Sequence, residues 1–308
     1  METKNKDVTF KVITLGCKVN AFESEEYKEE LCSRGLKESE DENADIYLVN
    51  TCAVTNVAAA KCRQKIHAIK RDHPNSLVAA VGCYVQISRK DLSAFDDCDV
   101  LAGSFNKRAL ADSIVKSYRE HIRIIQVDEQ TEEKVDNTVL KHFYQTRAYL
   151  KIEDGCDQFC SYCVIPFARG RERSLPYSEA IAQAQALVSS AHQELVLTGI
   201  HTGRWTDKNL KLADLMKGLL NNVPNLERLR LSSIEMNEVS DEIIELMKKD
   251  RRGARHLHIP LQAAHNETLK NMRRPYTLEE YRNRIETIKH QIPDISISSD
   301  IIVGFPKE

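Results

Sequence analysis

The chain has 308 residues, enough for two domains at about 150 residues each. Hydrophobic residues make up 42% and charged residues 29%, which excludes a disordered, collagen-like or coiled-coil chain. The 44 Lys and Arg residues against 46 Asp and Glu residues give a formal charge of -2, so no overall field draws the molecule to nucleic acid or membrane. Any contact with nucleic acid must come from a local patch.

The opening sequence METKNKDVTFKV lacks the apolar stretch, preceded by positive charge, that marks a secretory signal. The longest apolar runs, such as LVAAVG, fall far short of the roughly 20 residues that cross a bilayer. We therefore expect a soluble, cytoplasmic protein without membrane contact. In that reducing compartment, its nine cysteines are expected to be metal ligands or catalytic thiols rather than disulfides.

Short β-rich runs alternate with polar helical stretches through residues 1–126. Strands are expected in VTFKVITLG, DIYLVN, LVAAVG and DVLAGS, and helices at 20–35 and 56–71. This alternation favours an α/β domain with an open, mostly parallel sheet and crossover helices. Residues 127–143 include an acidic stretch with almost no apolar periodicity, so we expect a linker there.

Residues 144–308 show the same alternation with a longer period. Five strand-like segments are expected, in AYLKIE, ELVLTGI, RLRLSSI, HLHIPLQ and ISISSDIIVGF. Helices are expected between them at 178–190, 209–221, 241–249 and 278–290. The pattern predicts a partial TIM-like barrel, whose chemistry lies at the carboxyl ends of its strands. A sixth unit is expected to be missing, because the chain stops after the fifth strand.

Cys156, Cys160 and Cys163 lie within GCDQFCSYC, directly after the first predicted barrel strand. Zinc structural sites usually have four ligands in two separated pairs, whereas this loop offers three thiols and no histidine. On a 4Fe-4S cluster, which four thiolates commonly hold, three cysteines would leave one iron open to a small molecule. A zinc knuckle with a distant fourth ligand, or a reactive thiol cluster, is the alternative.

Cys17, Cys52 and Cys83 each follow the carboxyl end of a predicted strand. In an open α/β sheet these ends line one edge, where ligands bind, so the three thiols are expected to converge on a second site. Any one of them alone would be read as a buried packing residue. Cys32, Cys62 and Cys98 show no such placement, and we assign them to packing.

Several other residues are candidate binding groups. Tyr162 could stack on a purine or simply cover apolar surface. The arginines of FARGRERS, at 169, 171 and 173, could hold phosphates or form a solvated charged face. His201 and Glu235 follow barrel strands on the functional side. In HLHIP, alternation places His256 and His258 on the same side of a strand, where packed and hydrogen-bonded histidines are the expectation.

The motif Cys156-x3-Cys160-x2-Cys163, with Tyr162 before its last cysteine, resembles that of radical S-adenosylmethionine enzymes. With TLGCKVN, NTC and GCY preceding it, the chain resembles the methylthiotransferase family over nearly its whole length. Within that family, LGCKVN, TGIHTG, SSIE and HLHIPLQ most resemble the branch that modifies N6-threonylcarbamoyladenosine in tRNA.

The resemblance implies two 4Fe-4S clusters, each with an open iron. Cys156, Cys160 and Cys163 would hold the cluster that binds and cleaves S-adenosylmethionine, and an electron donor would reduce it. An auxiliary cluster that carries sulfur would be held by Cys17, Cys52 and Cys83. The residues expected near S-adenosylmethionine are Tyr162, Thr198, Gly199, Ser232 and Glu235. No catalytic residue is assigned.

The implied reaction replaces the C2 hydrogen of adenine with a methylthio group, next to the anticodon of tRNA. A base in that single-stranded loop can be splayed into a pocket. Alternatives are a ribosomal-protein aspartate or isopentenyladenosine in tRNA as the target, or a non-catalytic iron-sulfur or zinc-binding protein.

The chain departs from the family pattern in three places. Members continue through a sixth barrel strand and a C-terminal RNA-binding TRAM domain, so the resemblance implies a truncated chain with weak tRNA affinity. After Gln262, where many members have Ser-Gly-Ser, the chain reads Ala-Ala-His. After TGIHTG it has Arg204 and Trp205, which are expected to narrow the pocket.

Overall fold

The computed structural model describes residues 7–105, 107–127 and 138–308. It divides into two compact units, the first Met1–Leu140 with Phe167–Gly170 and the second Lys141–Pro166 with Arg171–Glu308. Most of the linker predicted at 127–143 falls in 128–137, outside the described residues. Each unit is an α/β structure, as the sequence pattern predicts.

The first unit is built on one six-stranded sheet in which every neighbouring pair is parallel. The strand order is β2-β1-β3-β4-β5-β6. The strands are β1 (Thr9–Thr14), β2 (Lys37–Glu38), β3 (Ile46–Thr51), β4 (Leu77–Gly82), β5 (Val100–Ala102) and β6 (Ile124–Gln126). All residues of β3 and β4 are buried, which matches their continuous apolar runs, because a parallel sheet is covered on both faces.

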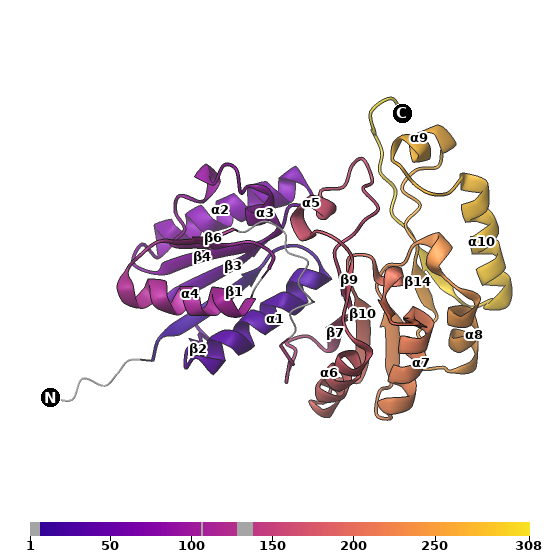
Figure 1. Cartoon of the computed structure of the whole chain (residues 1–308), viewed down its shortest axis with the longest axis horizontal. Coiled ribbons are helices and arrows are strands. Elements are labelled where there is room, and N and C mark those ends of the chain that lie inside the picture. Colours follow the sequence, from indigo (N-terminus) through magenta and orange to yellow (C-terminus); the bar gives the residue numbers. More distant parts are fainter. Residues whose placement is uncertain (1–6, 106, 128–137) are drawn as a thin grey trace. The chain divides into compact units, whose positions relative to one another are not determined.

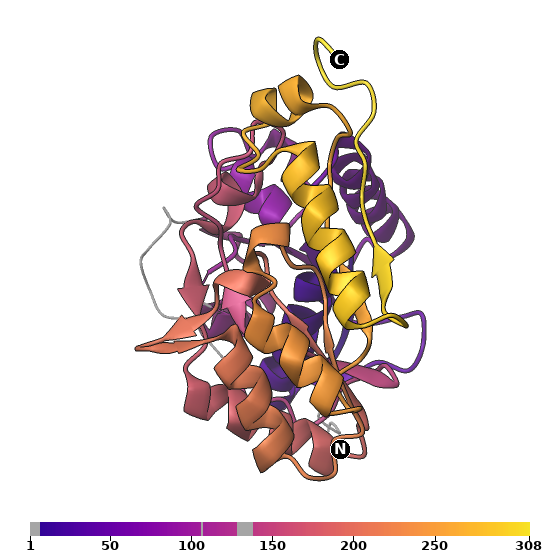
Figure 2. The same cartoon turned by 90° about the vertical axis from the view of Figure 1, so that its right-hand side faces the viewer.

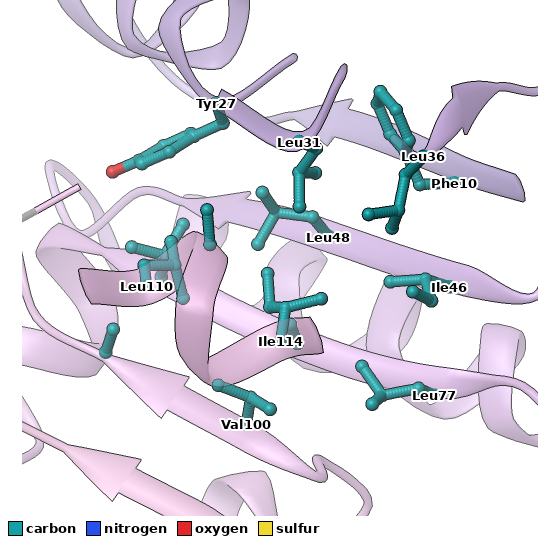
Figure 3. Packing of buried hydrophobic residues seen from close by; sticks show 14 residues of the cluster. Phe10, Tyr27, Leu31, Leu36, Ile46, Leu48, Leu77, Val100, Leu110 and Ile114 are labelled. Carbon is teal, nitrogen blue, oxygen red and sulfur yellow. The ribbon is translucent and has the colours of Figure 1, made fainter. Parts of the chain in front are cut away.

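Helices cover both faces of this sheet: α1 and α4 lie on one face, and α2 and α3 on the other (Figure 1). The helical segments are α1 (Lys18–Ser33), α2 (Asn56–Asp72), α3 (Cys83–Ile87), α4 (Lys107–Glu120) and the 3-10 turn η1 (Ser93–Phe95). Between α1, α4 and the sheet, Leu31 and Ile114 pack onto Leu48 and Val100 within one apolar cluster (Figure 3). This core holds α1 and α4 against the sheet and so keeps in place the strands whose carboxyl ends carry Cys17, Cys52 and Cys83.

The second unit arranges its main strands in chain order, all parallel. The sheet β7-β10-β13 continues through the parallel bridge between Ser233 and His258 to β14, which pairs with β15. These strands are β7 (Arg147–Lys151), β10 (Glu194–Thr198), β13 (Arg228–Leu231), β14 (His256–His258) and β15 (Ser296–Ser298). The partial TIM-like barrel predicted from the five strand-like segments is therefore confirmed.

Helices α7, α8 and α10 lie side by side on the outer face of this unit (Figure 2). The helical segments are α6 (Tyr177–Ser189), α7 (Leu212–Asn222), α8 (Asp241–Lys249), α9 (Asn266–Asn271), α10 (Leu278–Gln291), η2 (Thr202–Arg204) and η3 (Met236–Glu238). The short helix α5 (Ile165–Arg169) begins in this unit, and its residues from Phe167 onward belong to the first unit. Two short antiparallel pairs complete the second unit: β8 (Glu153–Asp154) with β9 (Arg173–Ser174), and the hairpin of β11 (Thr206–Asp207) with β12 (Leu210–Lys211). In the described part of the chain, no helix has the length and apolar character needed to cross a membrane.

One predicted helix start was wrong. The helix expected from residue 209 begins at Leu212, because the preceding residues form the β11–β12 hairpin, with Lys208 at a φ of 56° in its turn. The Asp214 carboxylate then accepts a 2.9 Å hydrogen bond from the Lys211 amide, which caps the first turn of the helix. Sequence periodicity alone does not separate this capped start from the polar hairpin before it.

Candidate metal centres

Three neighbouring strands deliver Cys17, Cys52 and Cys83 to one edge of the first sheet. Cys52 and Cys83 come directly after β3 and β4, and Cys17 lies three residues beyond β1. The strands are in parallel register, so their carboxyl ends coincide at this edge. Burial raises the pKa of the Cys52 and Cys83 thiols, that of Cys83 to about 11, and the neighbouring Cys17 contributes to both rises. Cys17 therefore lies close enough to each of the other two thiols to interact with it electrostatically.

Asn20 joins the loops that carry two of these cysteines. Its side-chain amide is buried and donates to the carbonyls of Leu15 at 2.8 Å and Thr51 at 2.9 Å. Leu15 stands two residues before Cys17, and Thr51 directly precedes Cys52. Since each carbonyl lies within two residues of a cysteine in the chain, this one amide fixes the separation of the two cysteine loops.

Gly16 allows these loops to approach closely. Its φ is +117°, and a Cβ built there would lie 2.8 Å from the Cβ and 3.0 Å from the Sγ of Cys52. A side chain at this position would therefore suffer both backbone strain and a collision with a candidate ligand.

We expect Gly16→Ala to destabilise the first unit by about 1–3 kcal/mol and to disturb the cysteine edge. Amide hydrogen exchange of peptides covering Ile46–Thr51 measures the local stability. Gly35→Ala is the matched control, because Gly35 has a φ of +84° but nothing within 4 Å of its Cβ position. Equal losses in the two variants would show that strain alone acts and that contact with Cys52 is unimportant.

The remaining cysteines of this unit divide into two groups. Cys62 and Cys98 are buried, as expected for packing residues. The Cys62 thiol also accepts from the Cys52 amide at 3.4 Å and donates to the Cys52 carbonyl at 3.6 Å, a contact that sequence reasoning missed. The packing assignment of Cys32 was wrong, because Cys32 lies near the end of α1 on its exposed side.

Arg169 is neither a phosphate-binding residue on the surface nor part of a solvated face. It belongs to the first unit, is fully buried, and donates from Nε to Cys83 Sγ at 3.2 Å. Its guanidinium also pairs with the buried carboxylate of Glu23. Of its two companions in FARGRERS, Arg173 is half-buried beside Asp154, and Arg171 is exposed.

The second cysteine group lies in the loop after β7 and β8 in the second unit. Cys163 donates its amide to the Cys160 carbonyl at 2.9 Å, which gives this part of the loop a tight turn. Ser161 connects the loop to the carboxyl end of α9, through its amide to the Met272 carbonyl at 3.2 Å and its hydroxyl to the Asn271 carbonyl at 2.8 Å. Cys156 and Cys163 are partly exposed and Cys160 is buried.

Cys156 is held beside a histidine and a carboxylate. Its Sγ lies 3.5 Å from His201 Nδ1, which is 2.9 Å from Glu172 Oε1, while His201 Nε2 lies 2.8 Å from Glu238 Oε1. Burial opposes charge on His201, but contacts with Cys156 and the two carboxylates raise its pKa to about 12. Among the described residues, Cys156, Glu172 and His201 form a group that could hold a metal ion, because one possible ligand atom from each lies within 4.8 Å of the other two. Sequence reasoning noted His201 but missed Glu172 and Glu238.

Cys160 contacts an arginine that sequence reasoning treated only as weak evidence of a basic cluster. Arg274 Nη1 donates to Cys160 Sγ at 3.4 Å, and Nη2 pairs closely with the Glu235 carboxylate. Arg274 is almost completely buried, and its Nε donates to the Tyr276 hydroxyl at 3.1 Å. Burial and the neighbouring Cys160 raise the pKa of Tyr162, whereas Arg274 lowers it. Glu235 therefore has a protein partner next to the cysteine loop.

The other residues expected near S-adenosylmethionine lie at the carboxyl ends of β10 and β13. Thr198 and Ser232 are buried, and Gly199 directly follows β10. A Cβ on Gly199 would lie 2.9 Å from Oε2 of Glu153, a fully buried carboxylate that accepts a hydrogen bond from the His201 amide at 2.5 Å. Within the described residues, Oε1 of Glu153 is buried without a hydrogen-bond partner.

The structure also shows the environments of the two strand histidines and of Trp205. His256 and His258 both contact Ser298 Oγ, at 3.1 Å and 3.0 Å, so the prediction that they share one side of a strand is confirmed. Trp205 is 1% exposed and donates from Nε1 to the Leu175 carbonyl at 2.8 Å, so it is a core residue of the second unit.

Two known protein families match the sequence of this chain. The Radical SAM superfamily matches residues 150–308, and the uncharacterized protein family UPF0004 matches residues 9–103. The second unit is therefore that of a radical SAM protein. Solved structures share the fold: the radical S-adenosylmethionine methyltransferase TsrM from Kitasatospora setae aligns with a TM-score of 0.70 at 14% identity, covering 98% of this chain and 69% of TsrM.

Curated relatives identify the family. The threonylcarbamoyladenosine tRNA methylthiotransferases MtaB of Bacillus subtilis and Thermotoga maritima are 37% and 35% identical, over 96% and 97% of this chain and 66% and 69% of their own lengths. The tRNA-2-methylthio-N(6)-dimethylallyladenosine synthase of Carboxydothermus hydrogenoformans is 33% identical, over 97% of this chain and 70% of its own. The chain belongs to the tRNA methylthiotransferase family of radical SAM proteins, as the cysteine motifs indicated, and spans about two thirds of these relatives' length.

Proposed function

We propose that the protein is a radical S-adenosylmethionine enzyme that transfers a methylthio group to C2 of N6-threonylcarbamoyladenosine in tRNA. The observation that carries the proposal is the presence of two cysteine triads, one at the strand ends of each unit, in a chain of this family. The two relatives at 37% and 35% identity are both named for threonylcarbamoyladenosine in tRNA.

The residues after β7 suit a 4Fe-4S cluster. Cys156, Cys160 and Cys163 provide three sulfur ligands, fewer than the four protein ligands of a closed structural zinc site, so one position stays open. Arg274 donates from Nη1 to Cys160 Sγ at 3.4 Å, so a positive group faces one of the three sulfurs. Oε1 of Glu153, buried without a partner among the described residues, marks a polar position in this unit that a bound molecule could satisfy.

The residues after β1, β3 and β4 suit a second cluster. Cys17, Cys52 and Cys83 again provide three sulfurs for a cluster that four thiolates commonly hold, so one iron would stay open. Gly16 leaves the space beside Cys52 that a side chain would fill, and Arg169 supplies positive charge at Cys83. Metal binding would deprotonate the thiols that burial keeps neutral.

When bound, the cluster at Cys156 supplies an electron to S-adenosylmethionine and the auxiliary cluster supplies sulfur, so the cofactors carry the difficult chemistry. This chain's own residues bind S-adenosylmethionine and orient it. We assign contact with S-adenosylmethionine to residues at the ends of β10 and β13 and in the cysteine loop: Tyr162, Thr198, Gly199, Ser232 and Glu235. Arg274 holds Glu235 in place beside Cys160.

The proposed function also implies a role for each domain, a target base in tRNA, an electron donor and a cellular compartment. We place residues 1–126 as the methylthiotransferase domain and 144–308 as the radical SAM domain. The target base lies in the anticodon loop, where it is unpaired and can leave the stack. A one-electron donor is required, and the substrate places the enzyme in the cytoplasm.

Nucleoside mass spectrometry tests this function. The chain is expressed in a bacterial strain whose own threonylcarbamoyladenosine methylthiotransferase gene is deleted, and bulk tRNA is digested and analysed. We expect the methylthio derivative of N6-threonylcarbamoyladenosine to return. Cys98→Ala, at a buried cysteine outside both triads, is the control and should retain activity.

Other outcomes would replace the proposal. A methylthio group on dimethylallyladenosine would move the chain to the branch of the Carboxydothermus relative, and one on a ribosomal-protein peptide would remove tRNA as the substrate. Neither product, from a chain purified with both clusters, would favour a non-catalytic iron-sulfur protein.

A further inference from the structure

One buried hydrogen-bond network connects the segments that carry Cys17, Cys52 and Cys83, the three candidate cluster ligands of the first unit. Arg169 donates from Nη2 to Asn20 Oδ1 at 2.9 Å, and from Nε to Cys83 Sγ at 3.2 Å. The amide of the same Asn20 donates to the carbonyl of Leu15, two residues before Cys17, and to that of Thr51, which directly precedes Cys52. The network therefore connects the carboxyl ends of β1, β3 and β4 through two side chains.

The orientation of the guanidinium is set by a carboxylate. Glu23 Oε1 accepts from Nη1 of Arg169 at 2.8 Å and Oε2 from Nη2 at 2.9 Å, a bidentate pair in which both side chains are about 2% exposed or less. Bidentate pairing fixes the plane of the guanidinium, which leaves Nε–H directed at the Cys83 sulfur. Glu23 lies on α1, whose packing on the sheet holds the carboxylate in place.

Stability alone does not explain this arrangement. A buried ion pair loses so much hydration that apolar side chains of similar size are often equally stabilising. A hydrogen bond from a positive group to a cluster-ligand sulfur has a distinct effect, because it stabilises the more negative, reduced state of the cluster. The guanidinium lies where it can exert that effect.

We propose that Arg169 is a positioning residue of the auxiliary cluster, which orients Cys83 as a ligand and raises the reduction potential of the cluster. This inference rests on the proposed function, since it needs a cluster at Cys17, Cys52 and Cys83. It adds to that function a means by which a residue just after the Cys156–Cys163 loop in sequence adjusts the sulfur-carrying site.

The test measures the potential of the auxiliary cluster by itself. In the full chain, Cys156, Cys160 and Cys163 are changed to Ala, the protein is reconstituted with iron and sulfide, and the midpoint potential is followed by electron paramagnetic resonance. Arg169→Met is combined with Glu23→Gln, so that no unpaired charge is buried. We expect the potential to fall by about 59 mV or more, a tenfold change in the one-electron equilibrium.

The matched control is Arg34→Met, at an arginine of the same unit that pairs with Glu30 and Asp112. It should leave the potential unchanged. Arg169→Lys retains the positive charge but lacks Nε–H, so it should also lower the potential, and it serves if the double variant fails to fold.

The possible outcomes distinguish the proposed role of Arg169 from the proposed auxiliary cluster on which it rests. A folded double variant that loses its cluster, while Arg34→Met keeps it, would support positioning of Cys83. A loaded Arg169 variant with an unchanged potential would overturn the inference. Failure of the parent protein, with Arg169 intact, to bind about four irons would instead overturn the auxiliary site itself.

Discussion

Replacing Cys17, Cys52 and Cys83 together with Ala is expected to lower the iron content of the reconstituted chain from about eight atoms to about four. The reason is that the two triads lie in separate compact units, each on its own set of strands. The triple variant should still cleave S-adenosylmethionine when dithionite is the reductant, but it should transfer no methylthio group to tRNA.

Three measurements on one sample check this result: iron and sulfide per chain, 5'-deoxyadenosine formed, and methylthiolated nucleoside. The control combines Cys32→Ala with Cys98→Ala, which changes one exposed and one buried cysteine outside both triads. Its iron content should stay near that of the parent. About eight irons in the triple variant, or about four already in the parent, would remove the auxiliary cluster from the account.

The placement of the triads could be predicted because it depends on local order. Cys17, Cys52 and Cys83 each follow a strand directly or within three residues, and parallel strands bring their carboxyl ends to one edge. Cys156, Cys160 and Cys163 lie close together in sequence, in one loop after β7 and β8. Cys52 and Cys83 needed only the recognition of IYLVNT and LVAAVG as neighbouring strands, and the observed register of β3 and β4 matches that interpretation. Five barrel strands were found for the same reason.

The partners of the cysteines could not be predicted in this way. Arg169 is 146 positions from Glu23, and Arg274 is 114 positions from Cys160, so no local pattern connects them. In sequence both arginines look like ordinary members of basic clusters. Only the packed structure shows that each is buried with one N–H on a cysteine sulfur.

Helix α1 shows why Cys32 was misassigned. Its sequence is rich in glutamates and looks solvent-exposed, yet Glu23, Glu25 and Glu26 are buried. Glu23 is buried because Arg169 compensates its charge, and Lys28 pairs with Glu25 at 3.1 Å. When ion pairs bury the polar side of a helix, hydrophobic periodicity no longer identifies the exposed positions, and Cys32 occupies one of them.

Glu153→Gln is expected to make the second unit more stable than the parent at pH 8, with little difference near pH 4. Burial raises the pKa of Glu153 from 4.5 to about 8, although the His201 amide opposes the rise. Between these values the unfolded chain is ionised while the folded chain holds a proton, so the parent loses stability as pH rises. At about 1.4 kcal/mol for each pH unit, the loss approaches about 5 kcal/mol by pH 8. Gln cannot ionise and escapes it.

Urea unfolding of the metal-free chain at a series of pH values, followed by tryptophan fluorescence, measures this difference. Trp205 is the single tryptophan of the chain and is buried in the same unit as Glu153, so its signal reports the relevant transition. Glu172→Gln is a control of opposite sign, because a hydrogen bond with His201 lowers the pKa of Glu172. Its ionised form stabilises the fold above pH 4.5, and that contribution is lost as pH falls through the lowered pKa, so Glu172→Gln should be less stable than the parent at pH 8. A Glu153→Gln difference that does not grow with pH would mean that Glu153 is already ionised in the folded chain.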